Sequence, residues 1–471
     1  MTVAPKIGLL PLYLELYDKT LPEMRKVLDP FLCEVSEKIA GAGIHVFPAP
    51  VCRLRQEVEA AIHTFHEEDV DLIVTLHLAY SPSLEAVSPL TRTHLPILML
   101  DTTLDESFGL DVDPIRLLYN HGIHGLQDLA SVLRRYEIFP FVVAGHLSDP
   151  KVLERVSGIA RAASAAKRLK STRALRIGPV FSGMGDFQVE EKTLESELGI
   201  QVEEILPEDL LEDVKSVSEE EIEDEIARDV EVFRVEAPEE VHQRSNRLGL
   251  GLRKYLERNK FDAFSLNFLS FDYQDGPLGT VPFLECSKAM ARGIGYAGEG
   301  DVLTASLVGA LQSAFGQTTF TEIFCPDWKG GSIFLSHMGE VNPEVAAAEP
   351  RLYEKDFSFT PTQNPAVLTC AIRPGTATLV NLAPAAHQKF NLIAARVEVL
   401  EDGTHPDIDD WIRAWILPEV PMARFLEIYS EEFGGTHHSA LMLGDHMSAL
   451  ASFARMTGMR FCPIEPGGKN E

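Results

Sequence analysis

Four side chains in the C-terminal half of the chain are of the types that bind a divalent metal ion. They are two carboxylates, Glu299 and Glu322, and two imidazoles, His337 and His438. Oxygen and imidazole ligands without a thiolate suit Mn²⁺, Mg²⁺ or Co²⁺ and can leave coordination positions open for a substrate. Because these residues are far apart in the chain they form no local motif, and the sequence alone predicts only a candidate metal site.

Each carboxylate also has a purely structural interpretation. Glu299 lies just before a predicted helix over residues 302–315, where a carboxylate can simply stabilise the helix N-terminus. Glu322 shares one face of a predicted strand with two phenylalanines. It is therefore either exposed on an aromatic face or buried with a charged partner or a metal, because a buried carboxylate is costly without one.

The histidines have structural alternatives as well. His337 is in phase with two aliphatic residues of a predicted strand, as a core or surface histidine would be. His437 and His438 follow a pair of glycines, which indicates a loop or the start of a helix. Adjacent histidines are expected to point in different directions, so we expect one ligand and one neighbour that supports it or contacts the substrate.

One glycine pattern is typical of a different function. Gly293, Gly295 and Gly298 have the spacing of a dinucleotide-binding loop. A dinucleotide-binding loop requires a preceding strand and an acidic residue about 20 positions later. Here a helical pattern precedes the glycines, and the position where the acidic residue is required is occupied by Thr318. We therefore expect no nicotinamide site, and we expect these glycines to form a tight turn beside Glu299.

Charge and composition exclude several classes of partner. The chain has 71 acidic and 42 basic residues and a formal net charge of -29, which repels nucleic acid and anionic lipid and attracts divalent cations. Its six cysteines form no CxxC pair, as expected in a reducing compartment. No apolar stretch is long enough to span a membrane. A cytoplasmic protein that acts on a small molecule is predicted.

Hydrophobic patterns divide the chain into three predicted domains. Short apolar runs alternate with helical patterns in residues 1–170 and again in 171–315, which indicates two α/β domains with parallel sheets. Residues 316–471 contain alternating strand patterns with Pro and Gly breaks, followed by a predicted helix over 447–457, which indicates an antiparallel β-rich domain. The acidic run over residues 203–225 is expected to be a solvated surface.

Four sequence blocks resemble the L-arabinose isomerase family and its L-fucose isomerase relatives. They are GYAGEGD (295–301), TFTEIF (319–324), LSHMGEVNP (335–343) and GGTHHSA (434–440). The resemblance implies that Glu299, Glu322, His337 and His438 bind the metal. It also implies a Rossmann-like N-terminal domain, a second α/β domain and a C-terminal antiparallel β-barrel-like domain, assembled as trimers or hexamers with shared active sites.

The resemblance continues more weakly toward the N-terminus. The segment NHGIHG (120–125) is similar to a family segment whose histidine reaches a neighbouring subunit's active site, which favours His124, with His121 as the alternative. The two histidines could instead cap a helix that begins near residue 126. Both interpretations are consistent with the sequence.

The residues expected to contact the sugar depart from the family pattern. After the first strand the chain reads PLYLELY (11–17), which offers Tyr13 and Glu15 in place of the family's sugar-contacting residues. Phe324 stands where the family usually has a tyrosine, and His437 is the expected neighbour of the metal ligand. Because specificity depends on such contacts, these departures from the family pattern favour a substrate other than L-arabinose.

The function implied is interconversion of an aldose and a ketose through an enediolate. A divalent metal, most simply Mn²⁺, would polarise the carbonyl, while Glu299 and Glu322 move the protons. Which glutamate takes the carbon-bound proton is left open, as is whether the sugar is neutral or anionic. The alternatives are a sugar-binding pseudoenzyme and a metal-dependent epimerase or lyase that acts on a modified sugar.

Overall fold

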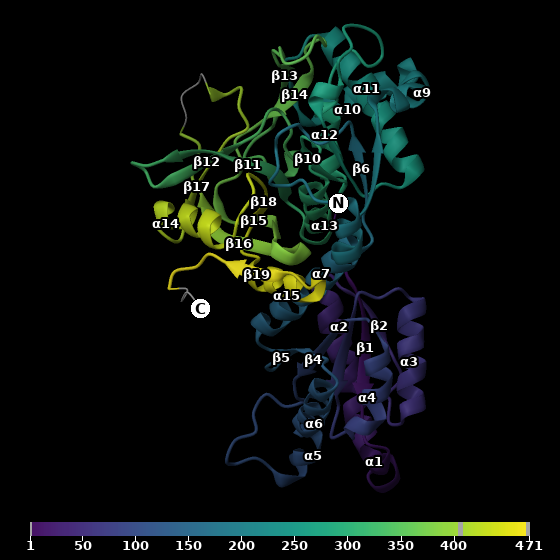
Figure 1. Cartoon of the computed structure of the whole chain (residues 1–471). Coiled ribbons are helices and arrows are strands. Elements are labelled where there is room, and N and C mark those ends of the chain that lie inside the picture. Colours follow the sequence, from purple (N-terminus) through teal and green to yellow (C-terminus); the bar gives the residue numbers. More distant parts are fainter. Residues whose placement is uncertain (1, 404–407, 468–471) are drawn as a thin grey trace. The chain divides into compact units, whose positions relative to one another are not determined.

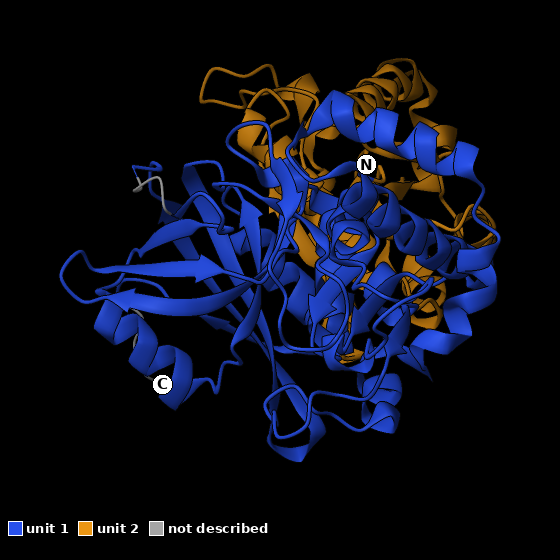
Figure 2. Ribbon diagram, turned by 90° about the horizontal axis from the view of Figure 1, so that it is seen from above, with its two compact units in different colours: residues 1–2, 168–471 blue, residues 3–167 orange. Residues whose placement is uncertain are grey.

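The computed structural model describes residues 2–403 and 408–467. The chain divides into two compact units, residues 3–167 and residues 168–471, the latter together with the first two residues. Figure 2 colours the two units separately. No helix within the described residues is both long enough and apolar enough to cross a membrane.

Residues 3–167 contain a five-stranded parallel sheet in the order β2-β1-β3-β4-β5. Its central strands are buried on both faces, because helices connect each strand to the next (Figure 1). The strands are β1 (Lys6–Leu12), β2 (His45–Pro48), β3 (Leu72–His77), β4 (Ile97–Asp101) and β5 (Phe141–Ala144). The helices are α1 (Glu15–Thr20), α2 (Arg25–Gly41), α3 (Arg55–Glu67), α4 (Ser83–Arg92), α5 (Leu117–Asn120), α6 (Gly122–Arg135) and α7 (Pro150–Lys170), whose last three residues are counted in the second unit.

The second unit begins with a four-stranded parallel sheet in the order β10-β9-β6-β7. Its strands are β6 (Arg173–Ile177), β7 (Gln201–Ile205), β9 (Ala263–Leu266) and β10 (Gly295–Gly298). The helices of this region are α8 (Glu191–Thr193), α9 (Leu211–Lys215), α10 (Glu219–Val232), α11 (Glu239–Asn259), α12 (Phe283–Ala291) and α13 (Val302–Phe315). Strand followed by helix is again the arrangement that the hydrophobic pattern predicted.

The C-terminal part forms a closed antiparallel barrel of six strands in the order β15-β18-β11-β12-β17-β16, closed by the pairing of β16 with β15. Closure leaves no free edge among these strands. The barrel strands are β11 (Thr318–Asp327), β12 (Ser332–Ser336), β15 (Gly375–Ala385), β16 (Lys389–Val399), β17 (Ala414–Pro418) and β18 (His438–Leu443). The predicted α/β class with Rossmann-like sheets and a C-terminal antiparallel barrel is confirmed.

Smaller elements complete the second unit. Strand β19 (Arg460–Pro463) pairs in parallel with β16, and β8 (Arg234–Val235), β13 (Arg351–Glu354) and β14 (Ala366–Thr369) form a separate small sheet. Helix α14 (Met422–Glu427) precedes β18, and α15 (Met447–Thr457) has the bounds that the sequence predicted. Short 3₁₀ or π turns are Pro22–Met24, Pro114–Arg116, Leu194–Leu198, Pro207–Leu210, Phe268–Ser270, Pro343–Val345, Ala386–Gln388 and Ile428–Glu432.

Helix α13 joins the parallel sheet to the barrel and packs against both. It contacts β10, β9 and β6 on one side and β11, β18 and β15 on the other, which explains why most of its residues are buried. Asp301 is its N-cap, and the Asp301 side chain accepts a hydrogen bond of 2.9 Å from the Thr304 N–H. The start of this helix is therefore fixed beside the barrel.

Part of the acidic run is buried, so the expectation of a solvated surface is wrong there. Glu225 on α10 is 4% exposed, and its carboxylate pairs with Arg253 at 2.6 Å and with Lys288 at 3.0 Å. Lys288 also pairs with Asp229 at 2.5 Å. Burial raises the pKa of Glu225, but the contacts with Arg253 and Lys288 outweigh burial and lower it. Arg228 also pairs with Glu225, Glu285 and Arg292 belong to the same charged cluster, and His242 lies 2.8 Å from Asp229.

Candidate active site

Three loops of the site follow the carboxyl ends of β6, β9 and β10. Phe181 follows β6, Phe268 follows β9 and Glu299 follows β10. Because these strands are parallel, their carboxyl ends meet at one edge of the sheet, where α/β proteins commonly bind ligands. The topology therefore places Glu299 at the mouth of a cleft.

Two of the glycines near Glu299 have a different role from the one predicted. Gly295 and Gly298 belong to β10 and are not in a turn. A Cβ on Gly295 would lie 2.0 Å from the Ala305 carbonyl oxygen, and a Cβ on Gly298 would lie 3.0 Å from the His337 ring. They allow close packing, while the turn itself uses Glu299 with φ 65° and Gly300 with φ 87°.

The barrel register brings Glu322 and His438 together. Glu322 on β11 pairs directly with His438 on β18, so the two side chains lie on the same face of the sheet. His438 is the first residue of a strand, and the expectation of a loop or helix start for it is wrong. Glu322 is partly buried and lines a cavity, so it is neither on an open aromatic face nor deep in the core.

His337 follows the last residue of β12 and does not share the environment of the aliphatic residues before it. Ile333 and Leu335 lie in the barrel core, whereas the side chain of His337 is 7% exposed and faces Phe320 with ring centroids 4.6 Å apart. Phe320 also contacts the His438 ring at 5.0 Å. This buried phenylalanine therefore packs against both imidazoles, whose ring centroids lie 6.0 Å apart.

A carboxylate binds the Nδ1 atom of each of the three histidines. His337 Nδ1 lies 2.8 Å from Glu340, His438 Nδ1 lies 3.0 Å from Asp301, and His437 Nδ1 lies 2.6 Å from Asp186. Such a partner fixes the ring orientation and leaves Nε2 available, an arrangement that is usual around metal-bound histidines.

Sequence reasoning did not find the roles of these three carboxylates. Glu340 lies within the LSHMGEVNP block, three residues after His337, and that spacing was an available signal. Asp301 caps helix α13 through one carboxylate oxygen and contacts His438 Nδ1 through the other. Asp186 lies 251 residues before His437, and Phe187 beside it stacks on His438 at 5.0 Å, contacts that no local pattern could indicate.

Within the part of the chain that the structure describes, two groups of three residues have the geometry to hold a metal ion. Glu299, His437 and His438 form one group, and Glu322, His337 and His438 form the other, with ligand atoms within 4.8 Å of one another in each. His438 belongs to both groups, so the four predicted ligands converge on it. His437 also approaches Glu299, at 3.7 Å, so the two adjacent histidines do not point apart as expected.

The Nε2 atom of His438 indicates that the donor set fits a cation. This atom is buried, has no hydrogen-bond partner among the described residues, and lies 3.4 Å from Glu299 Oε2. A buried polar nitrogen without a partner is costly, and a bound cation would satisfy it. Its neighbours are carboxylate oxygens and imidazole nitrogens, which suit a divalent ion of the Mn²⁺ class.

Local charges shift the pKa values of the site in opposite directions. Burial would lower the pKa of His438, but Asp301 and Glu299 outweigh burial and raise it to about 9. Burial would raise the pKa of Glu299, but His437 and His438 outweigh burial and lower it to about 2. Glu299 is therefore ionised at neutral pH and carries the negative charge that a cation needs.

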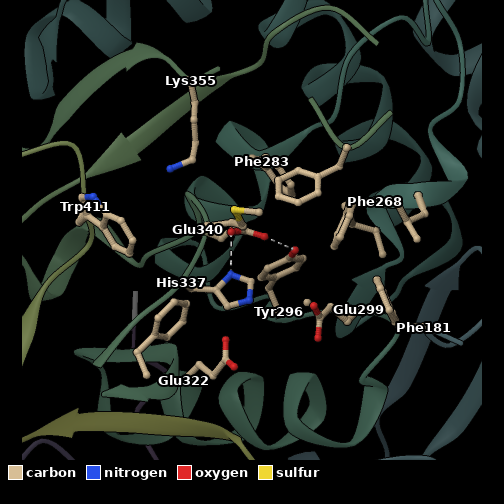
Figure 3. Close-up of a pocket in the computed structure, with 16 residues that line it drawn as sticks. Phe181, Phe268, Phe283, Tyr296, Glu299, Glu322, His337, Glu340, Lys355 and Trp411 are labelled. Atoms are coloured by element: carbon tan, nitrogen blue, oxygen red, sulfur yellow. Dashed lines mark hydrogen bonds and ion pairs between the residues drawn. The ribbon is translucent and has the colours of Figure 1, made fainter. Parts of the chain in front are cut away.

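The glutamates and His337 face a cavity of about 360 Å³ (Figure 3). That volume is within the range of small-molecule sites. Apart from its titratable groups the wall is mainly aromatic and aliphatic, and it includes Phe324, one of the predicted substrate contacts. The other lining residues are Phe181, Leu266, Phe268, Leu269, Phe283, Tyr296, Gly298, Met338, Glu340, Lys355, Phe359 and Trp411.

The remaining predicted contacts, Tyr13, Glu15 and His124, belong to the first unit, which is described by itself. Tyr13 is buried, and its hydroxyl has no hydrogen-bond partner among the described residues. Glu15 forms an ion pair of 2.9 Å with Lys19. Their roles in substrate binding stay predictions.

His124 lies in the first turn of α6, which begins at Gly122, so the expected helix start near residue 126 is wrong. His121 occupies the N-cap position without a side-chain cap bond, so histidine capping is not observed. Its Nε2 atom lies 3.0 Å from the Tyr17 hydroxyl, and its ring contacts that of His124.

Comparison with known proteins gives consistent matches. Residues 185–316 match the model of the L-arabinose isomerase central domain, and residues 317–460 match that of the L-arabinose isomerase C-terminal domain. L-arabinose isomerase of Mycolicibacterium smegmatis is 28% identical over 84% of this chain and 80% of its own. The L-arabinose isomerase of Nocardioides sp. is 28% identical over 90% of this chain and 86% of its own. That of Shouchella clausii is 27% identical over 83% of this chain and 81% of its own.

A solved structure of a sugar ABC transporter sugar-binding protein from Bacillus halodurans covers 68% of this chain and 89% of its own. Its sequence identity is 12% and its TM-score is 0.16, so the likeness carries no argument about fold or function.

Proposed function

Because the chain belongs to the L-arabinose isomerase family, we propose that it is a metal-dependent aldose–ketose isomerase with Glu299 and Glu322 as its acid/base groups. Family membership supports a sugar isomerase in general. The observation that carries the specific proposal is that both glutamates converge on His438 and face one cavity. A protein that only binds sugar has no need of two such carboxylates.

The metal would be held by Glu299, Glu322, His337 and His438. His437 is close enough to Glu299 and His438 to serve as a further ligand. When bound, a divalent cation polarises the sugar carbonyl and stabilises the negative charge that develops on the sugar oxygens. Mn²⁺ suits this donor set best, with Mg²⁺ or Co²⁺ as alternatives. Asp301, Glu340 and Asp186 keep the three histidine rings oriented.

The chain's own residues would move the protons. One of Glu299 and Glu322 takes the proton from C2 of the open-chain sugar and returns it to C1, and the other transfers the hydroxyl proton. Both residues line the cavity, so both can reach adjacent carbon and oxygen atoms of one substrate. The aromatic part of the wall would leave fewer water molecules around the sugar while the negative charge develops.

Assembly and location are further parts of the proposal. The family resemblance favours a homo-oligomer, a trimer or hexamer, in which His124 contacts the sugar bound by a neighbouring subunit. All six cysteines are free, which is consistent with the proposed cytoplasmic location. The departures at Tyr13, Glu15 and Phe324 from the family pattern support a substrate other than L-arabinose.

Metal removal tests the reaction directly. We expect the protein to convert at least one member of an aldose panel to its ketose with Mn²⁺, to lose this activity after treatment with a chelator, and to regain it when Mn²⁺ is restored. NMR in deuterated water measures both the ketose and hydrogen exchange at C2. Undiminished turnover in the chelated protein would contradict metal dependence, and exchange without ketose would indicate an epimerase instead.

The Glu340→Gln variant tests whether Glu340 positions His337. Glu340 accepts a hydrogen bond from His337 Nδ1, so we expect its loss to weaken Mn²⁺ binding by about 10- to 100-fold. The control is Tyr296→Phe, which removes a different hydrogen bond to Glu340 and leaves the His337 contact in place. Electron paramagnetic resonance of free Mn²⁺ measures affinity in folded protein. Equal effects of the two variants would indicate a general structural role.

A further inference from the structure

Lys355 brings a positive charge into the cavity from the side away from the proposed metal ligands. It follows β13, and its backbone N–H donates a hydrogen bond of 3.0 Å to the Pro365 carbonyl oxygen. Figure 3 shows its side chain entering at one edge, with Glu322 and Glu299 near the other edge and His337 between them. The cavity therefore has a cationic end and an anionic end.

No carboxylate of residues 2–403 or 408–467 lies within ion-pair distance of Lys355 Nζ. Glu340 acts on Lys355 electrostatically, but both of its carboxylate oxygens already accept hydrogen bonds. Oε1 accepts one from the Tyr296 hydroxyl, and Oε2 accepts one from His337 Nδ1. Asp410, the other acid that acts on it, pairs with Arg351.

The surroundings make an unpaired cation costly. Burial lowers the pKa of Lys355, although Glu340 and Asp410 act in the opposite direction. Phe283, Phe359 and Trp411 line the same cavity and offer no hydrogen-bond acceptor that could replace water around the ammonium group. An anionic group that entered the cavity would gain a charge-assisted hydrogen bond there.

We propose that Lys355 binds a carboxylate of the substrate, so that the sugar is an aldose with a carboxylate at the end remote from its carbonyl, a uronate-type sugar. This inference rests on the proposed function, since the other end of the sugar would meet Glu299 and Glu322. Lys355 is the single lysine or arginine among the described residues that line the cavity. One cation matches the single charge of a carboxylate better than a phosphate, which carries about −1.5 to −2 at neutral pH.

The closing experiment measures binding to metal-free protein, so that the carboxylate cannot chelate a metal. Calorimetry compares aldohexuronates of the gluco, galacto and manno series with the matching neutral hexoses and hexose 6-phosphates. We expect the best uronate to bind at least about tenfold tighter than its neutral counterpart, and Lys355→Met to abolish that preference, as one charge-assisted hydrogen bond would predict.

Two further variants control for charge and folding. Lys355→Arg should keep most of the preference, and Lys329→Met should keep all of it, because Lys329 is exposed at the turn between β11 and β12. The proposal is overturned if neutral sugars bind as well as uronates or if phosphates bind more tightly. It is equally overturned if Lys355→Met weakens uronate and neutral sugar alike, which would show a structural role.

Turnover with Mn²⁺ separates this inference from the proposed function. If uronate binding depends on Lys355 but no sugar of any class yields a ketose, the isomerase proposal fails and the carboxylate site stands. If neutral aldoses are isomerised and uronates are not, the isomerase proposal stands and the carboxylate site fails. The isomerase proposal and the carboxylate site are both supported if Lys355→Met lowers kcat/KM for the uronate about tenfold more than for the neutral sugar.

Discussion

Glu322→Gln is expected to lower kcat for aldose–ketose conversion by about 10²- to 10⁴-fold, the usual contribution of a positioned acid or base. Glutamine keeps the size of the side chain but can neither accept the proton nor supply the negative charge that faces His337 and His438. Glu299→Gln should have an effect of the same order, because Glu299 occupies the equivalent place beside His437 and His438.

The control for both variants is Glu427→Gln. Glu427 is exposed on α14 and pairs with Arg424 at 3.4 Å, a surface contact of little energetic weight. Measurements at saturating Mn²⁺ separate lost proton transfer from lost metal affinity. The assignment would be refuted if either glutamine variant, with metal bound, retained the turnover of the control.

Deuterium exchange distinguishes the roles of the two glutamates. The variant that lacks the base for the carbon-bound proton should lose exchange at C2 together with ketose formation. The variant that lacks only the hydroxyl-proton group should retain slow exchange at C2. Both rates come from the same NMR time course, so a single experiment assigns the residues.

Glu225→Gln is expected to lower the free energy of unfolding by about 3–5 kcal/mol, because it leaves Arg253 and Lys288 with less compensating charge in a buried cluster. Glu223→Gln is the matched control, since Glu223 is exposed on the same helix. Urea unfolding monitored by circular dichroism measures the difference. A loss no larger than that of the control would show that water reaches the cluster.

The pH dependence of this cluster has a defined sign. The pKa of Glu225 is lower in the folded protein than the value of 4.5 of an unperturbed glutamate, so the folded state binds the proton less readily than the unfolded state. Its contribution to stability is complete above about pH 5 and is lost progressively as the pH falls below that value. The stability of wild type and Glu225→Gln should therefore converge in acid, and parallel curves would contradict the argument.

The double variant Glu225→Gln/Lys288→Met separates lost pairing from lost packing. Removing both charges takes away the uncompensated cation, so the double variant should be less destabilised than Glu225→Gln alone. Lys288 also contacts Asp229, so recovery should be partial. Additive losses in the double variant would show that Glu225 and Lys288 do not interact.

Local patterns were sufficient to predict the elements whose residues are buried in a regular way. Short continuous apolar runs indicated the strands of the first sheet, and an apolar pattern with the period of a helix indicated α15. Strands β10 and β18 were missed, because β10 contains two glycines and β18 begins three residues after the pair Gly434-Gly435. Glycine was interpreted as a turn signal where close packing was the actual reason.

The sequence by itself determined the chemical types available, which are two glutamates and three histidines in recognisable blocks, and it determined the fold class through periodicity and resemblance. Only the tertiary structure decided which of them meet. The pairing of Glu322 with His438 depends on the register between two barrel strands, and the partners Asp186, Asp301 and Glu340 depend on contacts between separate elements. The same holds for Lys355, because only folding places this partly buried lysine at the wall of a cavity, where no carboxylate of the described residues pairs with it.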